Sequence, residues 1–441
     1  MKLRAIAKEI FLGTLRRISV SEAIRSRVQY RNRQLHVAGR VYPMQQFHRL
    51  AVIAIGKAAA PMADALLDAI DPALSGSQYI DSIVVGPTKP QRDDSRVRYF
   101  RGSHPFSDQT AHDAADAILA LLQACDEATL VIFLVSGGAS AMVEKPLGAR
   151  ISLEDEALFQ RALVQSGLPI TQMNVLRKHF SRVKGGRLAV AAQRAAQCTL
   201  LISDVPHSTP HVIGSGPSLP DPSTIQECRR IIHVNLASLH LPDRVLAFFH
   251  GPECEETPKL DHPAFQRAHS ALLLSSDDLT ARAGELARLD GFHVVVDNTC
   301  DDWDYREAAA YLLNRLSGLR QQFPRVCLLS VGEVSVQIPP AHGLGGRNQQ
   351  FALECARRLD QQNLSATVLS GGSDGVDGNS PAAGAICDET TFQRAAASGL
   401  DPLGALERFD SFTLFSALGD AMLTRPTGNN LRDLRILLSE A

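Results

Sequence analysis

The sequence ATVLSGGSDGVDG occupies residues 366–378 and joins a strand-like run to an acidic, glycine-rich loop. The apolar run Ala366–Leu369 has the length of a buried strand. In the loop that follows, Asp374 and Asp377 lie among four glycines, which let a backbone approach a ligand closely. Ligands of open α/β sheets bind at the carboxyl ends of the strands. The stretch therefore predicts an α/β fold with a cation or general-base site here; a tight turn that uses Asp for turn chemistry is the alternative.

Apolar runs of strand length alternate with helical patterns along most of the chain, which is typical of parallel α/β sheets. The earlier runs are Leu50–Ile55, Ser82–Val85, Leu130–Val135, Thr199–Ile202, Ala271–Leu274, His293–Val296 and Val326–Leu329. A chain of 441 residues is too long for one hydrophobic core. We therefore predict two α/β domains, each a mostly parallel sheet flanked by helices, with a Rossmann-like N-terminal domain. The predicted domains are residues 1–245 and 265–441, because residues 239–264 hold four prolines and little periodicity.

The composition excludes several classes of protein. The chain is 45% hydrophobic and 21% charged, and its formal net charge of −2 gives no electrostatic footprint for nucleic acid. Its eight cysteines are scattered without CxxC or metal-ligand spacing, which indicates reduced thiols. The N-terminus lacks an apolar signal core, and no stretch of 18 apolar residues occurs. We expect a cytoplasmic protein that binds a small molecule and has no nucleic-acid or membrane partner.

Other strand-like runs also end in small, polar or charged residues. These ends are Gly56-Lys57, Ser136–Ser140, Ser203-Asp204 and Gly332-Glu333. One end of each predicted sheet would therefore be lined by such loops. Residues 136–140 could present backbone N–H groups to an anion at a helix start, although a plain strand-to-helix turn is an equal alternative.

Two basic segments suit an anionic ligand. Residues 174–184 are predicted to form a helix that carries Arg177, Lys178 and Lys184 and ends at Gly185-Gly186. Arg347 opens a second helix after the glycine-rich residues 343–346. A cation at a helix N-terminus opposes the helix dipole, at a cost of up to about 1 kcal/mol, which a bound anion would offset. A solvated basic face and an exposed loop arginine are the alternatives.

Two common nucleotide-binding motifs are absent. Gly56-Lys57 is followed by Ala58 and lacks the upstream glycine of a GxxxxGK[ST] loop. No GxGxxG opens a helix after a strand, because Gly214-Ser215-Gly216 runs into Pro217. A Walker-type NTPase and a Rossmann dehydrogenase therefore lose support.

In this order, the loops resemble those of the class II glycerate 2-kinases, proteins with DUF4147 and MOFRL domains that are also labelled hydroxypyruvate reductases. In the N-terminal half, the matching segments are IGKA at 55–58, SGGASA at 136–141, NVLRKH at 174–179, KGGRLA at 184–189, SDV at 203–205 and GSGP at 214–217. In the C-terminal half they are GEVSV at 332–336, GGRNQ at 345–349 and DGVDG at 374–378. Each segment is weak alone, but the combination is specific and spans nearly the whole chain.

The resemblance implies a kinase that phosphorylates D-glycerate, or a closely related hydroxy acid, at the 2-hydroxyl to give 2-phosphoglycerate. It implies ATP and Mg²⁺ as cofactors and an active site between two domains, and it leaves a homodimer open. The catalytic residues that it implies are Lys57, Arg347 and Asp204. The implied cofactor-binding residues are Ser136, Gly137, Gly138, Ser140, Lys184, Gly345, Gly346 and Glu333, and the implied metal ligands are Asp374 and Asp377. A hydroxypyruvate reductase-type oxidoreductase and a non-catalytic ligand-binding paralogue are the alternatives.

The chain departs from the family pattern beside these loops. His207-Ser208 replaces a usual Gly-Asp pair, Pro381 stands in a usual Thr-Asp-Ala-Ala-Gly segment, and Arg425 enters the loop before Pro426. Two acidic positions are lost and one arginine is gained beside the implied site loops. The departures leave the exact hydroxy acid open.

We predict that Arg425 widens the range of acids toward larger or more anionic substrates. A second carboxylate would gain a charge-assisted hydrogen bond worth roughly 1.5–3 kcal/mol. The measurement is kcat/KM for glycerate, tartronate and a four-carbon sugar acid, in the wild type and in Arg425→Gly. A preference for glycerate that is unchanged in Arg425→Gly would mean instead that Arg425 only faces solvent.

Overall fold

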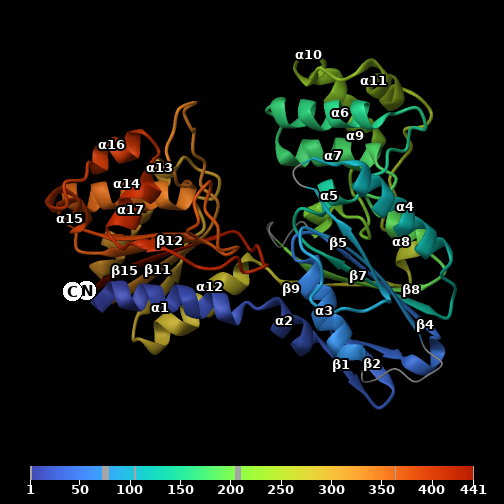
Figure 1. The fold of residues 1–441 in the computed structure, drawn as a ribbon, viewed down its shortest axis with the longest axis horizontal. Coiled ribbons are helices and arrows are strands. Elements are labelled where there is room, and N and C mark those ends of the chain that lie inside the picture. Colours follow the sequence, from blue (N-terminus) through green and yellow to red (C-terminus); the bar gives the residue numbers. More distant parts are fainter. Residues whose placement is uncertain (1, 72–78, 104–105, 204–209, 363, 441) are drawn as a thin grey trace. The chain divides into compact units, whose positions relative to one another are not determined.

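The computed structural model describes residues 2–71, 79–103, 106–203, 210–362 and 364–440 (Figure 1). The chain forms two compact units. The N-terminal unit comprises residues 20–273, and the C-terminal unit combines residues 274–441 with residues 1–19. Each unit has its own six-stranded sheet.

The sheet of the N-terminal unit has the strand order β6-β5-β4-β7-β8-β9. Its strands are β4 (Arg49–Ile55), β5 (Tyr79–Gly86), β6 (Val97–Arg101), β7 (Thr129–Val135), β8 (Ala196–Ile202) and β9 (Ala268–Leu274). The pairings from β6 through β8 are all parallel. Every residue of β7 and β8 is buried, as expected for a parallel sheet covered on both faces. The predicted Rossmann-like, parallel N-terminal sheet is confirmed.

Helices cover both faces of this sheet. Helix α3 (Ala59–Ile70) contacts β4, β5 and β7, and α4 (Gln109–Gln123) with α8 (Arg187–Ala191) lies on the other face (Figure 1). The unit also contains α2 (Val20–Arg27), β1 (Val28–Arg31), β2 (Gln34–Val37), β3 (Arg40–Pro43), η1 (Met44–Gln46), α5 (Ala139–Met142), η3 (Pro210–Ser215) and η4 (Pro263–Phe265). Strands β1–β3 form a separate antiparallel sheet.

A helical layer stands beyond the sheet in the N-terminal unit (Figure 1). It comprises α6 (Leu153–Gln165), α7 (Ile170–Phe180), α9 (Ile225–Val234), α10 (Leu236–Leu239) and α11 (Asp243–His250). Four phenylalanines, Phe159, Phe180, Phe248 and Phe249, pack ring against ring in its core. This separate core fixes α7, which carries Arg177 and Lys178. The helix predicted over residues 174–184 is too long, because α7 ends at Phe180 and Lys184 lies in the turn that follows.

The sheet of the C-terminal unit has the order β10-β11-β15-β12-β13-β14. Its strands are β10 (His293–Val296), β11 (Arg325–Gly332), β12 (Thr367–Gly372), β13 (Gly384–Asp388), β14 (Ala421–Met422) and β15 (Asp433–Glu440). The β10–β11 pairing is parallel, whereas β15 pairs antiparallel with both β11 and β12. The prediction of a mostly parallel sheet is wrong for this unit, because β15 inserts between β11 and β12 and because residues 373–383 reverse the chain between β12 and β13.

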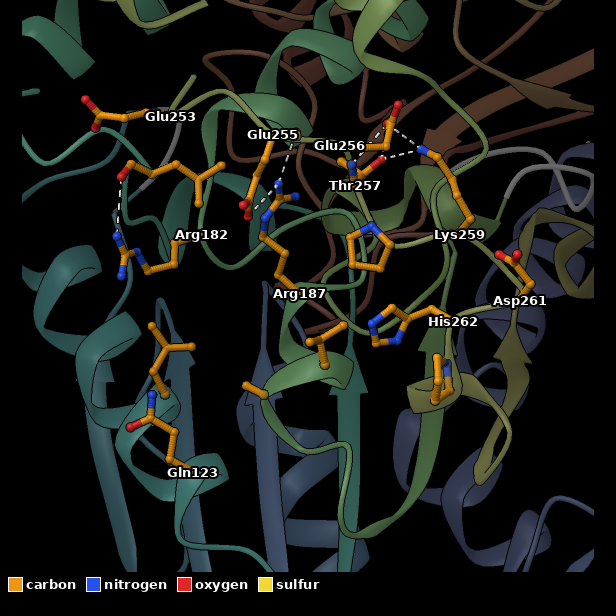
Figure 2. A pocket seen from close by; sticks show the side chains of 16 residues that line it. Gln123, Arg182, Arg187, Glu253, Glu255, Glu256, Thr257, Lys259, Asp261 and His262 are labelled. Carbon is orange, nitrogen blue, oxygen red and sulfur yellow. Dashed lines mark hydrogen bonds and ion pairs between the residues drawn. The ribbon is translucent and has the colours of Figure 1, made fainter. Parts of the chain in front are cut away.

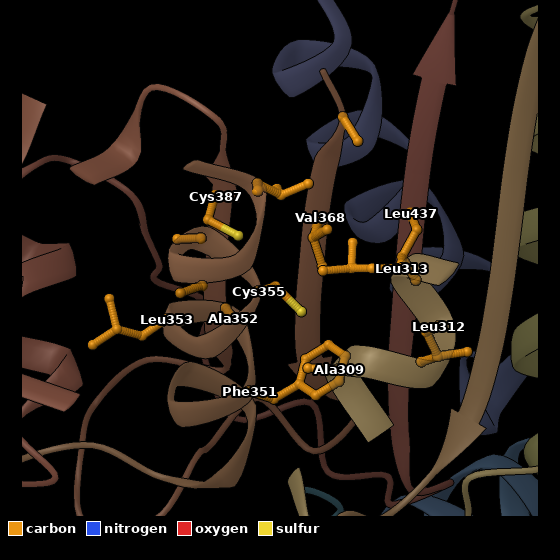
Figure 3. Packing of buried hydrophobic residues seen from close by; sticks show 14 of the residues in the cluster. Ala309, Leu312, Leu313, Phe351, Ala352, Leu353, Cys355, Val368, Cys387 and Leu437 are labelled. Carbon is orange, nitrogen blue, oxygen red and sulfur yellow. The ribbon is translucent and has the colours of Figure 1, made fainter. Parts of the chain in front are cut away.

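Two layers of helices cover this second sheet. Helices α1 (Lys2–Arg17) and α12 (Ser276–Leu289) pack on one face, and α13 (Tyr305–Arg320) and α14 (Arg347–Gln362) on the other (Figure 1). Helices α15 (Thr391–Ala397), α16 (Pro402–Glu407) and α17 (Ser411–Ala417) complete the unit. Figure 3 shows the core between α14 and the sheet, where Phe351 and Cys355 pack with Val368 and Leu437.

The two units do not coincide with the domains predicted from sequence. The first nineteen residues belong with the C-terminal unit, because Ile10 and Phe11 of α1 are buried against its sheet. The proline-rich residues 251–264 belong with the N-terminal unit, where Thr257 bonds the carboxylate of Asp221. In the described part of the chain, no helix is both long and apolar enough to cross a membrane. All eight cysteines are free and buried.

Candidate functional site

In the C-terminal unit, three strand ends meet at one edge of the sheet. Asp433, the first residue of β15, lies opposite Gly332 at the end of β11 and opposite Gly372 at the end of β12. Because β15 runs antiparallel to both neighbours, its start adjoins their carboxyl ends. The loops of Glu333 and Asp374 therefore leave the sheet beside Asp433.

Arg347 lies at the centre of this edge, as the first residue of α14. Its Nε donates to Oδ2 of Asp433 at 2.6 Å and its Nη2 to Oδ1 at 3.2 Å, while Nη2 also lies 2.8 Å from Oε1 of Glu333. Burial lowers the pKa of Arg347, but Asp433 and Glu333 outweigh it and hold the pKa above the usual range. Burial raises the pKa of Glu333, and Arg347 offsets this only in part. The two carboxylates thus compensate a guanidinium that the helix dipole alone would disfavour.

A second arginine–carboxylate pair supports the first. Arg432 donates to both oxygens of Asp301, at 2.5 and 2.8 Å, and the backbone N–H of Glu333 donates to the same carboxylate at 3.0 Å. We call Arg347, Glu333, Asp433, Arg432 and Asp301 the arginine cluster. Bidentate pairs of this kind fix geometry as well as charge.

Arg435 lies two residues along β15 from Asp433 and is fully buried. Its Nη2 donates to the carbonyl of Gly332 at 3.0 Å, and its guanidinium lies 5.2 Å from the ring centroid of Phe351. Burial lowers the pKa of Arg435. Since Phe351 is one turn after Arg347 on α14, Arg435 secures both the strand end and the helix that form the arginine cluster.

The two aspartates of the acidic loop have different surroundings. Asp377 is buried, and its carboxylate accepts the backbone N–H groups of Asn348 and Gln349, at 3.0 and 2.9 Å, and both of their side-chain amides. It therefore caps α14. Burial raises the pKa of Asp377 to about 6, although the N–H bonds from Gln349 and Asn348 lower it. Asp374 is only partly buried, and its Oδ1 accepts the N–H of Val376 at 3.1 Å.

Gly345 and Gly346 bring the α14 loop against the acidic loop. A side chain at Gly346 would overlap Asp377, and one at Gly378 would overlap the carbonyl of Gly345. The N–H of Gly345 donates to Asn379 Oδ1 at 2.8 Å. Close packing of the two loops thus explains Gly346 and Gly378, whereas a side chain at Gly345 would collide with Ser411.

In the N-terminal unit, the loops after β4 and β7 are bonded to each other. The N–H of Lys57 donates to the carbonyl of Gly137 at 2.9 Å, and the N–H of Ala58 donates to Ser136 Oγ at 3.0 Å. Gly56 has φ +121°, and a side chain there would collide with Ser136. The Lys57 ammonium forms no hydrogen bond or ion pair with any residue that the structure describes.

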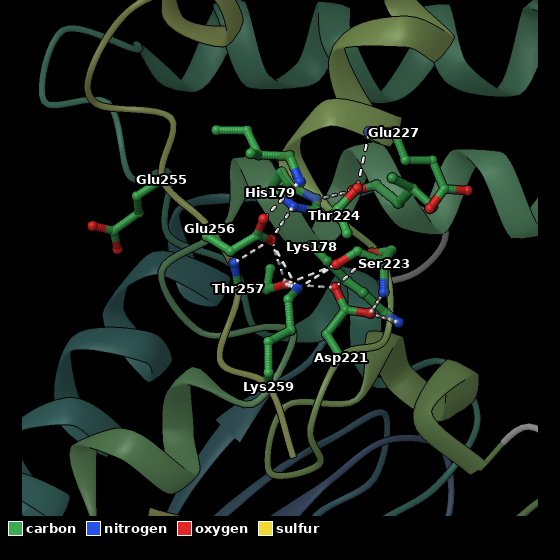
Figure 4. Close-up of polar contacts among 12 residues, drawn as sticks. Lys178, His179, Asp221, Ser223, Thr224, Glu227, Glu255, Glu256, Thr257 and Lys259 are labelled. Atoms are coloured by element: carbon green, nitrogen blue, oxygen red, sulfur yellow. Dashed lines mark hydrogen bonds and ion pairs between the residues drawn. The ribbon is translucent and has the colours of Figure 1, made fainter. Parts of the chain in front are cut away.

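Two of the lysines in the basic segment are already paired. The ammonium of Lys184 bonds Glu144, and both side chains are buried. Lys178 donates to Asp221 at 2.9 Å, in a network with Ser223, Thr257 and, through Glu256, His179 and Lys259 (Figure 4). These lysines hold the Gly185-Gly186 turn in place, because Lys178 and Asp221 both approach Gly185.

Hydroxyl and amide groups connect the remaining loops of this edge. Ser140 and Ser215 lie 3.0 Å apart through their Oγ atoms, and Ser215 Oγ donates to Oδ1 of Asn174 on α7 at 3.1 Å. The N–H of Gly185 donates to the carbonyl of Ser215 at 3.0 Å. We call Lys57, Ser140, Ser215 and Asn174 the N-terminal loop edge.

The structure gathers the predicted residues within each unit. Lys57 and Ser136–Ser140 lie together in one unit, and Glu333, Arg347 and the acidic loop lie together in the other. Asp204, with His207-Ser208, lies outside the described residues. Sequence reasoning missed Asp433, Arg432, Asp301 and Arg435.

A cavity of 960 Å³ lies elsewhere, between α4, α8 and residues 253–263 (Figure 2). Arg182, Arg187, Lys259 and His262 line it together with Glu253, Glu255, Glu256 and Asp261. None of the predicted site residues lines it, and its charges are mixed. It therefore adds nothing to the predicted site.

Comparison with known proteins places the chain among described families. The model described as "Domain of unknown function (DUF4147)" matches residues 6–250, and the MOFRL family model matches residues 326–433. The glycerate 2-kinase of Pyrococcus horikoshii is 30% identical over 98% of this chain and 94% of its own length. An Agrobacterium vitis protein, provisionally named a hydroxypyruvate reductase, is 36% identical over 88% of this chain and 99% of its own length. The crystal structure of glycerate kinase from Thermotoga maritima aligns over 99% of both chains with a TM-score of 0.84 and 28% identity.

Asp433→Asn is expected to disorder Arg347, because an amide cannot accept both guanidinium bonds and leaves the cation undercompensated. Turnover of the chain's substrate should fall about 10- to 100-fold in kcat/KM. The matched control is Glu440→Gln at the other end of β15, where a half-exposed pair with Arg325 at 3.3 Å should matter little. Equal activity of the two variants would show that Asp433 does not position Arg347.

Asp377→Ala is expected to lower the free energy of unfolding by about 2–4 kcal/mol, because four N–H donors at the start of α14 lose their acceptor. Urea denaturation measures the change. Asp374→Ala, which removes a more exposed carboxylate, should cost less than about 1 kcal/mol. The assignment of Asp377 as the cap fails if the two losses of stability are alike.

Proposed function

The chain belongs to the family that the DUF4147 and MOFRL models define, and we propose that it is a glycerate 2-kinase, transferring a phosphoryl group from ATP to the 2-hydroxyl of D-glycerate to form 2-phosphoglycerate. The observation that carries the proposal is the match to the Pyrococcus horikoshii enzyme, which runs through both domains rather than one. The fold supports it, since the aligned Thermotoga maritima structure is that of a glycerate kinase.

The arrangement of charges suits phosphoryl transfer, which depends on positioning and on stabilising negative charge. Arg347 is held by two carboxylates and so is pre-oriented rather than mobile. Lys57 offers an ammonium that no described residue has compensated. We assign both to anionic groups of the reactants, and we keep Asp204 as a proposed catalytic residue on the strength of its motif. The predicted role of Lys184 in cofactor binding has less support, because its ammonium already forms an ion pair with Glu144.

The residues present fit Mg²⁺ better than a tightly caged metal. Among the described residues, no three His, Cys, Asp or Glu side chains converge as a metal site. Mg²⁺ usually keeps several waters and takes one or two protein carboxylates together with substrate phosphates. Since hydrogen bonds occupy both oxygens of Asp377, we assign the metal to Asp374 and treat Asp377 as its support. When bound, the ion would neutralise charge on the phosphates.

The name of the Agrobacterium vitis relative favours a second function, hydroxypyruvate reduction. Against it, the first parallel strand of the N-terminal unit, β4, leads into Gly56-Lys57-Ala58 rather than a dinucleotide fingerprint. The eight free, buried cysteines suit a reducing compartment, and we propose the cytoplasm as the site of action.

The proposed function predicts formation of 2-phosphoglycerate when the protein is incubated with ATP, Mg²⁺ and D-glycerate. ³¹P NMR identifies the product and separates the 2-phospho from the 3-phospho isomer. Excess EDTA should abolish the signal, and Arg347→Ala should lower kcat/KM by about a hundredfold or more.

Two results would contradict the proposal. One is NADH oxidation by hydroxypyruvate without any phosphorylated product, which would favour the reductase. The other is unchanged product formation in EDTA, which would remove the metal from the reaction.

A further inference from the structure

Arg177 differs from three buried cations that lie in or just after the basic segment of the N-terminal unit. Lys178, Lys184 and Arg187 each face a carboxylate, those of Asp221, Glu144 and Glu255. Arg177 is partly buried on α7, and it has no hydrogen bond or ion pair with any residue in the described ranges. A guanidinium withdrawn from water without an anion is costly.

The electrostatic surroundings of Arg177 point the same way. Burial lowers the pKa of Arg177, and Glu144 opposes this only at a distance. The carboxylate of Glu144 already forms an ion pair with Lys184. Arg177 therefore carries a positive charge that no described residue of its unit pairs with a hydrogen bond or an ion pair.

The position of Arg177 connects it to the N-terminal loop edge. It follows Asn174 by three residues, so both side chains lie on adjoining parts of one helix face. Asn174 is bonded to Ser215, and Ser215 to Ser140 in the loop after β7. That loop is bonded in turn to the backbone of Lys57. A chain of hydrogen bonds thus connects α7 to the carboxyl ends of β4 and β7. Ligands of parallel sheets bind at such strand ends.

We propose that Arg177 binds the carboxylate of the hydroxy-acid substrate. The planar fork of a guanidinium matches a carboxylate in two parallel hydrogen bonds, whereas an ammonium such as that of Lys57 acts as a point charge suited to phosphate. In Arg347, Asp433 and Glu333 already bind Nε and Nη2, so this guanidinium cannot offer a carboxylate the two parallel hydrogen bonds that the unpaired Arg177 can offer. The identity of the acid rests on the proposed function, but the carboxylate site does not.

The test compares Arg177→Gln with wild type on D-glycerate and on D-glyceramide, which lacks the carboxylate. The variant should raise KM for D-glycerate about 10- to 100-fold and leave KM for ATP within about threefold. The wild-type preference for the acid over the amide should largely disappear. Arg177→Lys should retain part of the preference, which keeps the test informative if Arg177→Gln folds poorly. The matched control is Arg182→Gln, an exposed arginine five residues along the chain whose bond to a carbonyl is 3.3 Å long.

A binding measurement separates this inference from the proposed function. Without nucleotide, D-glycerate and tartronate should raise the melting temperature of wild type and Arg182→Gln, and not that of Arg177→Gln. If no acid is phosphorylated yet these shifts appear, the kinase proposal fails and the carboxylate site stands. A raised KM for ATP with an unchanged KM for glycerate, or an equal acid-dependent shift in all variants, overturns the site.

Discussion

The bidentate pair between Arg347 and Asp433 is the interaction on which the C-terminal unit's functional edge depends. It joins the first residue of α14 to the first residue of β15, and β15 lies between the two strands whose loops carry Glu333 and Asp374. The Asp433 side chain is only 3% exposed, whereas that of Arg347 is 35% exposed, so the buried carboxylate is tolerable because the guanidinium compensates its charge. Arg432 with Asp301 and Arg435 with Gly332 hold the same strand ends from either side. Rigidity here is therefore electrostatic as much as hydrophobic.

The sequence reveals the strands and loops far better than it reveals the partners of charged residues. Apolar runs ending in glycine or charge identify β4, β7, β11 and β12, because burial and turn chemistry are local signals. The same reasoning does not find Asp433, because Asp433 lies at the start of an antiparallel strand. The rule that ligands bind at the carboxyl ends of strands applies to parallel sheets. Lys184 likewise cannot be distinguished from Arg177 by sequence, since Glu144, forty residues earlier, decides which cation is paired. The antiparallel pairing of β15 with β11 and β12 depends on the tertiary structure. The apolar pattern of one strand does not show which strands it pairs with, or in which direction.

The cations of the protein divide into two groups once their partners are known. Lys178 and Lys184 are buried against Asp221 and Glu144, and their bonds fix a glycine turn beneath the N-terminal loop edge. Lys57 and Arg177 have no such partners among the described residues. In the N-terminal unit, the paired lysines thus support the turn, whereas the charges of Lys57 and Arg177 are available for a ligand. Net composition near neutrality conceals this division, which only the three-dimensional pairing brings out.

Helix α1 has a consequence for how the chain is made. The ring of Phe11 abuts Gly371 of β12, and Arg4 bonds Asp388 and Asp420, so the opening helix completes a unit whose remainder begins at residue 274. Residues 20–273 are thus an insertion within another unit. During vectorial synthesis, the inserted unit emerges whole and can fold while α1 still lacks its sheet. The sheet of the C-terminal unit can be completed only after β15 has been synthesised. Until then, the apolar face of α1 remains exposed and could associate with other apolar surfaces.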